Sequence, residues 1–233
     1  MTPSGADLVR VDGPEDGVAT VTLDRPDRKN ALSIALRDQV SDTLDALAAD
    51  EAARVVVLAG AGDDFCAGFD LAEFQQAFDD DAEAEAHDRR LWASSDRFHR
   101  TVLTFPLPTV AAVSGAALGG GFDLAVMCDL RVASETAWFA HPERDFTEVV
   151  YGPLHELVGG SVARDLALTG RRVTAAEALE LRLVSAVVPA DRLPGEAAGL
   201  AAQIATAPRE VLWRMKAKII GRADIATGRT LDL

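Results

Sequence analysis

The sequence predicts an α/β fold built around a mainly parallel sheet. Two runs, "RVVVLAG" at 54–60 and "TVAAVSG" at 109–115, are almost continuously apolar, as in strands that are covered on both faces. Stretches with helical spacing of apolar residues lie between and after these runs, and this alternation of strand and helix is typical of α/β proteins. With 233 residues, of which 48% are hydrophobic, the chain can form one large domain or two small ones.

The other elements follow from local patterns. "VATVTLD" at 18–24 alternates apolar and polar residues and predicts a strand. Leucine and valine then recur at helical spacing and predict an amphipathic helix over 33–49. Further along, we expect a helix near 83–103, a strand at 130–134 after a glycine-rich helix, a helix that starts at the capping-box pair Thr174 and Glu177, and a helix from Pro208 to about Gly221.

Charge and cysteine content limit the classes of function. Lysine and arginine total 23 against 37 acidic residues, a net charge of −14, which argues against broad nucleic-acid binding. Cys66 and Cys128 form no CxxC motif, so no zinc site or disulfide framework is expected and a reducing cytoplasm is the simplest compartment. No signal peptide is recognisable.

Two segments need separate interpretation. The uncharged run 101–122 is long enough to span a membrane, but its prolines and the aspartate that follows it favour a buried core segment. The acidic segment 79–88 predicts a solvated helix start or a mobile loop.

A glycine-rich stretch, "SGAALGGGFDLAVMCD" at 114–129, combines three consecutive glycines with Asp123 in apolar surroundings. It matches neither the dinucleotide-binding fingerprint, nor the P-loop, nor the GxSxG elbow of serine hydrolases. What remains is a helix N-terminus after a buried strand, where free N–H groups favour a negative oxygen. A second such turn, "FCAGFDL" at 65–71, could bring another N–H to the same carbonyl oxygen and form an oxyanion hole, although close helix packing would also explain the glycines.

Several motifs together resemble the enoyl-CoA hydratase/isomerase, or crotonase, family. They are "RKNALS" at 28–33, "FCAGFDL", "AAVSGAALGGGFDLAVMCDLRVAS", "FAHPE" at 139–143 and "LTGRRVTAAEALELRLVSAVV" at 168–188. The resemblance implies a crotonase-like ββα spiral core over 1–190, a short C-terminal helical region over 191–233, and assembly as homotrimers or dimers of trimers. It also implies an acyl-CoA thioester as ligand, with no cofactor beyond coenzyme A and no metal.

The same resemblance implies the functional residues. The N–H groups of Phe69 and Gly120 would form the oxyanion hole, and Asp123 and Glu143 would be the two catalytic acids. We expect Glu143 to act at the α-carbon and Asp123 to activate the water. The coenzyme A contacts would come from Arg25, Arg28, Lys29, Ala31, Ala67, Asp70 and Leu71.

The sequence departs from the family pattern at three places. Asp123 stands where hydratases usually have glutamate, which shortens the reach of the acid by one methylene. After Glu143, "RDFTEVVYGPLHELVGG" replaces the usual Pro-Gly-x-Gly-Gly turn and is about four residues shorter, so Glu148, Tyr151 and His155 either face the acyl pocket or belong to ordinary surface and packing. The short C-terminal region could open the site or change the assembly. His141 could tune Glu143 or be structural.

Alternatives therefore stay open. Hydration of a 2-enoyl-CoA is the leading hypothesis, and an isomerase that shifts the enoyl double bond with Glu143 alone is the next. A catalytically silent acyl-CoA binder belongs to a different class, and two retained acids argue against it. A dehalogenase or hydrolase is weaker, because "FCAGF" resembles the dehalogenases but no aspartate stands clearly at their nucleophile position.

Overall fold

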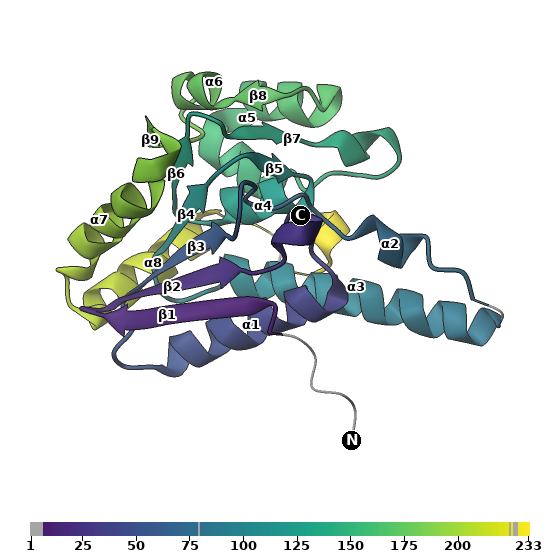
Figure 1. Cartoon of the computed structure of the whole chain (residues 1–233), viewed down its shortest axis with the longest axis horizontal. Coiled ribbons are helices and arrows are strands. Elements are labelled where there is room, and N and C mark those ends of the chain that lie inside the picture. Colours follow the sequence, from purple (N-terminus) through teal and green to yellow (C-terminus); the bar gives the residue numbers. More distant parts are fainter. Residues whose placement is uncertain (1–6, 79, 224, 226–227) are drawn as a thin grey trace.

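The computed structural model describes residues 7–78, 80–223, 225 and 228–233, and its strands form two sheets (Figure 1). The larger sheet has the order β1-β2-β3-β4-β6-β9, in which only the β1–β2 pair is antiparallel. The smaller sheet has the order β5-β7-β8. The predicted α/β class with a mainly parallel sheet is confirmed.

The bounds of the larger sheet agree closely with the sequence pattern. Its strands are β1 (Val9–Glu15), β2 (Val18–Leu23), β3 (Val55–Gly60), β4 (Thr109–Val113), β6 (Leu130–Ser134) and β9 (Ala186–Val188). Strand β1 and strand β9 were not expected. The run at 109–115 gives a strand that ends at Val113, because Gly115 takes a positive φ of 50° and turns the chain.

Helices cover both faces of this sheet, as the continuous apolar strands require. On β3, Val55 and Val57 point to one face and Val56 and Leu58 to the other, which is the two-residue period of a strand. The first face packs against α7 (Leu193–Ala205), whose buried positions are mostly alanine four residues apart, so the helix approaches closely. The second face packs against the main core with α1 (Ile34–Ala49) and α3 (Asp81–Leu103).

The glycine-rich stretch forms the link between the two sheets. Contrary to expectation, a short strand, β5 (Ala116–Leu118), intervenes before the helix α4 (Gly120–Met127) begins. All residues of α4 are buried, and a Cβ added at Gly121 would fall 2.3 Å from the carbonyl oxygen of Cys66. The third glycine is therefore required for close packing of α4 against the turn after β3.

The remaining elements belong to the smaller sheet, to the helices around the two sheets and to the C-terminal region. The further elements are η1 (Pro26–Arg28), α2 (Leu71–Phe74), β7 (Trp138–Ala140), η2 (Pro142–Asp145), α5 (Gly152–Thr169), β8 (Val173–Thr174), α6 (Ala175–Glu180), η3 (Ala190–Arg192), α8 (Arg209–Ala223) and η4 (Thr230–Asp232). Thr174 caps α6 as predicted, with its side chain accepting from Glu177 N. The boundary at residue 190 stays a prediction, and α7 beyond it is part of the covering of the large sheet.

Two sequence interpretations can be checked directly. The uncharged run 101–122 passes through the end of α3, strands β4 and β5 and the start of α4, and most of it is buried, which confirms a core segment. None of the helices in the described residues combines the length and apolar character needed to cross a bilayer. In the acidic segment, Asp80 caps α3 and α3 starts at Asp81, as expected for a helix start, while Asp79 lies outside the described residues.

Candidate active site

The candidate site is a cavity of about 590 Å³ between the turn after β3, the start of α4 and η2. Its wall contains Phe69, Gly120, Asp123 and Glu143, so the structure brings all four predicted catalytic and oxyanion residues into one space. Apolar side chains form most of the remaining wall, among them Phe74, Trp92, Phe146 and Leu231. A cavity with an apolar wall and a few convergent polar groups is the usual form of a small-molecule site.

Two backbone turns lie side by side at one end of this cavity. Cys66 N donates to Ala116 O at 3.0 Å, and Leu118 N donates to Cys66 O at 3.0 Å, so the turn after β3 is fixed to β5. Gly68 has a φ of 88°, and a Cβ there would fall 2.6 Å from Leu118 O and 3.4 Å from Gly120 N. The positive φ and the close approach both require glycine at this position.

The amides that follow these turns are free to bind a ligand. Within the described part of the chain, neither Phe69 N–H nor Gly120 N–H donates a hydrogen bond to another protein group. Gly120 is the first residue of α4, where the helix dipole adds to the attraction of a negative oxygen. The geometry therefore offers a carbonyl oxygen two N–H donors from separate elements.

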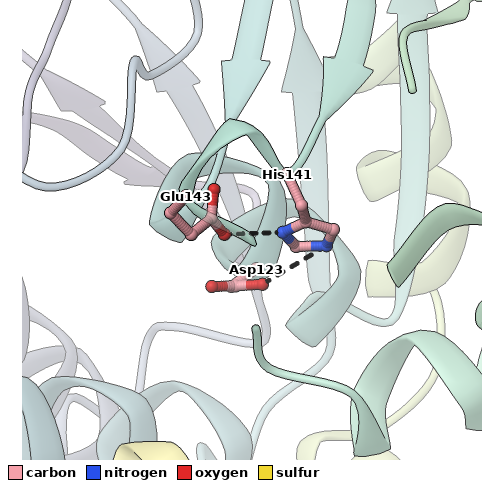
Figure 2. Close-up of side chains that lie close together, drawn as sticks. All are labelled: Asp123, His141 and Glu143. Atoms are coloured by element: carbon pink, nitrogen blue, oxygen red, sulfur yellow. Dashed lines mark hydrogen bonds and ion pairs between the residues drawn. The ribbon is translucent and has the colours of Figure 1, made fainter. Parts of the chain in front are cut away.

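The two predicted acids share a neighbouring histidine, which faces both of them (Figure 2). His141 Nδ1 lies 2.8 Å from Glu143 Oε1, and its Nε2 lies 3.9 Å from Asp123 Oδ1. Asp123 is 3% exposed and His141 is 1% exposed. Asp123 comes from the first turn of α4, Glu143 from η2 and His141 from the residue before η2. The group is therefore built from the segments that follow β5 and β7 of the smaller sheet.

Burial changes the protonation of this group. Burial, opposed by the charge of His141 and assisted by that of Glu143, raises the pKa of Asp123 to about 8. Burial lowers the pKa of His141, but its hydrogen bond to Glu143 and the charges of Asp123 and Glu143 outweigh this effect and raise that pKa above its usual value. At neutral pH, Asp123 therefore holds its proton, and the pKa of His141 is shifted toward the charged form by its contact with Glu143.

Among the described residues, Asp123, His141 and Glu143 form one group that could hold a metal ion, because their possible ligand atoms all lie within 4.8 Å of one another. Nδ1 of His141 is already bonded to Glu143, however, so we interpret the group as sharing protons. The expectation of no metal stays untested.

The residues predicted for coenzyme A come from two segments, 25–31 and 67–71, which hydrogen bonds join beside the cavity. Arg25 Nη2 lies 3.0 Å from Asp70 Oδ2, and Arg25 Nη1 donates to Ala31 O at 2.5 Å, which joins three of the predicted residues. Ala67 and Leu71 line the cavity. Of the remaining two, Arg28 is exposed at the end of η1, and Lys29 is exposed with its Nζ 3.6 Å from Asp64.

The three candidate residues in the segment after Glu143 do not lie together. Glu148 lines the cavity. Tyr151 and His155 are absent from the described wall of that cavity and instead face one another, with ring centroids 5.5 Å apart. Sequence reasoning did not anticipate that Thr230 and Leu231 of the C-terminal region would line the cavity, because no motif links residues so distant in the chain.

Fold and site together define an enzyme class in which two backbone amides stabilise negative charge on a carbonyl oxygen while neighbouring acids move protons. The family model for enoyl-CoA hydratase/isomerase matches residues 13–231. The chain belongs to the enoyl-CoA hydratase/isomerase family.

Individual relatives agree with this assignment. A putative enoyl-CoA hydratase of Thermus thermophilus is 41% identical over 191 residues, covering 81% of this chain and 74% of the relative. A probable enoyl-CoA hydratase of Rhizobium meliloti is 42% identical over 195 residues, covering 81% and 72%. Among solved structures, a probable enoyl-CoA hydratase/isomerase from Mycobacterium abscessus has a TM-score of 0.82 at 33% identity, covering 94% of this chain and 84% of that one. A monofunctional enoyl-CoA isomerase from M. smegmatis has a TM-score of 0.78 at 31% identity, covering 94% and 95%.

Proposed function

We propose that the protein adds water reversibly to the double bond of a 2-enoyl-CoA thioester. The observation that supports this most directly is the presence of two free amides and two acids in one cavity. When water attacks the β-carbon of a conjugated thioester, negative charge develops on the carbonyl oxygen as an enolate forms. Phe69 N–H and Gly120 N–H would stabilise that charge, and losing one such donor typically costs about 3 kcal/mol of transition-state stabilisation.

The two acids divide the proton transfers. Glu143 Oε2 lies beside the glycine turn, since a Cβ built on Gly119 would fall 2.8 Å from it, so this acid is next to the carbonyl and its α-carbon. Asp123 lies one turn further along α4 and holds the water. In hydration, the water oxygen bonds to the β-carbon, the ionised form of Asp123 takes the water proton, and Glu143 gives its proton to the α-carbon. Because burial raises the pKa of Asp123 to about 8, the fraction of the protein with Asp123 ionised grows as the pH rises toward that value.

The predicted coenzyme A segment completes the substrate site. The guanidinium of Arg25 is largely buried and bonded to Asp70, so its role is to hold the two segments together. The side chains of Arg28 and Lys29 are exposed, and these are the cations available to the phosphates. Other parts of the coenzyme A moiety would lie along Ala31, Ala67 and Leu71. The reaction uses no metal and no further cofactor, so dialysis against EDTA should leave the rate unchanged.

We extend the proposal to the surroundings of the enzyme. Two buried free cysteines support a reducing compartment, the cytoplasm. The net charge of −14 supports the absence of nucleic acid among its partners. Assembly as a homotrimer or a dimer of trimers would cover the apolar side chains exposed on α8, among them Trp213 and Ile219.

A second candidate, double-bond isomerisation by Glu143 alone, is favoured by one specific observation. Asp123 has a shorter side chain than the usual glutamate, and burial keeps it protonated at neutral pH. An isomerase needs one acid that removes and returns a proton, so Glu143 would suffice.

The deciding experiment follows the conjugated ultraviolet band of short and medium 2-enoyl-CoA thioesters. We expect the purified protein to remove the band, and Glu143→Gln and Asp123→Asn to be slower by about 100-fold or more. Asp145→Asn is the matched control, since its side chain on the same short helix is 70% exposed. If the unchanged protein does not remove the band, and both it and Asp123→Asn are fully active toward 3-enoyl-CoA thioesters, the isomerase replaces the hydratase.

A further inference from the structure

The peptide group that carries the Phe69 N–H is held from its carbonyl end. Gly68 O accepts a hydrogen bond from Leu32 N at 2.7 Å, and Leu32 pairs with Phe69 as an isolated parallel bridge. In a trans peptide the C=O and N–H bonds point in opposite directions. The bond from Leu32 therefore fixes the direction of the Phe69 N–H, which is free to meet a ligand in the cavity that Phe69 lines.

A largely buried guanidinium stands at the other end of the same line of hydrogen bonds. Arg25 Nη1 donates to Ala31 O at 2.5 Å, and Ala31 O belongs to the peptide group whose N–H is that of Leu32. The order is thus guanidinium, two peptide groups and cavity, and each N–H donates in the direction of the cavity.

Such a line strengthens its last donor. Hydrogen bonds in series polarise one another, so a donor that bonds to a peptide C=O makes the N–H of that peptide a better donor. A bond from a charged donor is about twice as strong as a neutral one. Leu32 is 0% exposed and the Arg25 side chain is 17% exposed, so water screens the line weakly. The ion pair with Asp70 uses the other terminal nitrogen of Arg25, Nη2, and leaves Nη1 to Ala31.

The two amides of the proposed oxyanion hole differ in what supports them. Gly120 begins α4, an eight-residue helix whose dipole favours a negative oxygen. Phe69 stands two residues before α2, which has only four residues. A second guanidinium, that of Arg37, donates to Leu32 O in the next peptide group and lies over the Phe69 ring, so it is outside the line. Of the two cations, Arg25 is the one whose hydrogen bonds lead to the Phe69 N–H.

We propose that Arg25 is a positioning residue of the oxyanion hole, which orients and polarises the Phe69 N–H through Ala31 and Leu32. No proton moves in this role, and the guanidinium strengthens one hydrogen bond to the substrate oxygen as negative charge develops there. This inference rests on the proposed thioester site and deepens it. The effect should be smaller than loss of the donor itself, which typically costs about 10²–10³-fold in kcat, because the Phe69 amide stays in place.

A bound chromophore can report this polarisation without turnover. The probe is sorboyl-CoA, a dienoyl thioester whose conjugated ultraviolet band moves to longer wavelength when its carbonyl oxygen is polarised. It is measured bound to Glu143→Gln, in which the proposed proton transfer to the α-carbon is blocked. We expect a red shift with Glu143→Gln, and a shift smaller by about half when Arg25→Met is added, because the line loses its charged member.

Substitutions at Arg25 separate charge from packing. Arg25→Lys keeps a cation that can donate to Ala31 O and should keep most of the shift, whereas Arg25→Gln is neutral and should lose as much as Arg25→Met. With Glu143 intact, we expect the two neutral variants to hydrate about tenfold more slowly in kcat, and Arg25→Lys to stay within about threefold of the unchanged protein. If circular dichroism shows that Arg25→Met is not folded, the comparison of Arg25→Gln with Arg25→Lys decides alone.

Two further variants exclude simple loss of an ion pair. Asp70→Asn breaks the ion pair but leaves the other hydrogen bond of Arg25 in place, and its side-chain oxygen can still accept from Ala72 N. Arg10→Met is the matched control, because its guanidinium lies 3.3 Å from Asp24, the residue before Arg25, and is outside the line. Both variants should keep the shift.

The outcomes distinguish this inference from the proposed function. If Arg25→Gln keeps the full shift, or if Asp70→Asn loses as much of it as Arg25→Gln, the role of Arg25 in polarisation is wrong and the hydratase is unaffected. If sorboyl-CoA binds and shifts as expected but the unchanged protein hydrates no thioester, the hydratase is wrong and the role of Arg25 is supported. If no acyl-CoA thioester binds, both proposals are overturned.

Discussion

Asp123 shows how one side chain combines a structural cost with a chemical use. It is a carboxyl group buried in the first turn of an otherwise apolar helix, and its surroundings favour the protonated form. Motif resemblance allowed the prediction that Asp123 and Glu143 belong to one site. The protonation state of Asp123 could not be predicted from the sequence, because its pKa depends on burial and on His141. The distance between His141 and Asp123 is set by the packing of β7 against β5.

The pH dependence of hydration should reveal the role of Asp123. If this group must be ionised to take the water proton, kcat/KM should rise about tenfold per pH unit below its pKa and level off above about pH 8. The measurement is the rate of hydration between pH 6 and pH 10. A rate that falls as the pH rises through 8 would show instead that Asp123 is the proton donor.

The same residue makes a prediction about stability that is independent of activity. The unfolded chain loses the aspartate proton near pH 3.9, whereas folded Asp123 keeps it up to about pH 8. The folded state thus binds more protons in this window, so the contribution of Asp123 to the free energy of unfolding is complete below pH 4 and is lost as the pH rises toward 8. Asp123→Asn has no proton to lose, so its Tm should rise relative to that of the unchanged protein as the pH is raised from 5 to 8. A difference in Tm that stays constant across this range would contradict the buried, protonated state.

At the scale of elements, predictability depended on length and periodicity. The runs that gave β2, β3, β4 and β6 are five or six residues long and carry a clear apolar pattern. Strands β5, β7 and β8 have two or three residues each, too few for any period to be visible. They nevertheless carry the site, since β5 leads into the glycine turn and β7 leads to His141 and Glu143. The elements that position the chemistry are therefore the ones that the local sequence least reveals.

The close contact between α4 and the turn after β3 should be sensitive to a single methyl group. Gly121→Ala would place a Cβ 2.3 Å from Cys66 O, and overpacking of this kind typically costs about 1–3 kcal/mol. We expect a lower free energy of unfolding in urea, together with slower hydration because the two free amides move apart. Gly195→Ala in α7 is the control, since a Cβ there meets nothing within 4 Å and alanine favours helix. An unchanged Gly121→Ala protein would show that this approach is looser than described.

At the scale of the whole molecule, the spiral arrangement could be expected only from the resemblance to a family. Apolar periodicity indicates that a strand is buried but not which strand lies beside it. Here the chain leaves the large sheet after β4, forms β5 and α4, and returns to pair β6 with β4, so two consecutive strands belong to different sheets. Apolar periodicity likewise cannot predict that Thr230 and Leu231 line the cavity. Thr230 N donates to Asp96 on α3, a contact across 134 positions of sequence.

Exposed apolar side chains favour association of this chain with further copies, and its net negative charge opposes it. Helix α8 buries only Leu212 and Lys216 in the described structure, while Trp213, Met215 and Ile219 are each about half exposed. We expect the protein to have three times the 24.7 kDa mass of one chain, or six times, in light scattering after gel filtration. With a net charge of −14 on each chain, the subunits repel one another, so dilution at low salt should dissociate the assembly more readily than dilution at 0.5 M salt.

A matched pair of substitutions locates the surface that holds this assembly together. Ile219→Glu on α8 should shift the protein toward the mass of a single chain, because it places a further negative charge in an apolar contact. Leu168→Glu adds the same charge on α5, where the side chain is 72% exposed, and should leave the mass unchanged. If both variants assemble normally, α8 is not the contact. A monomer in every condition would mean that the exposed apolar face of α8 serves another purpose than joining copies of this chain.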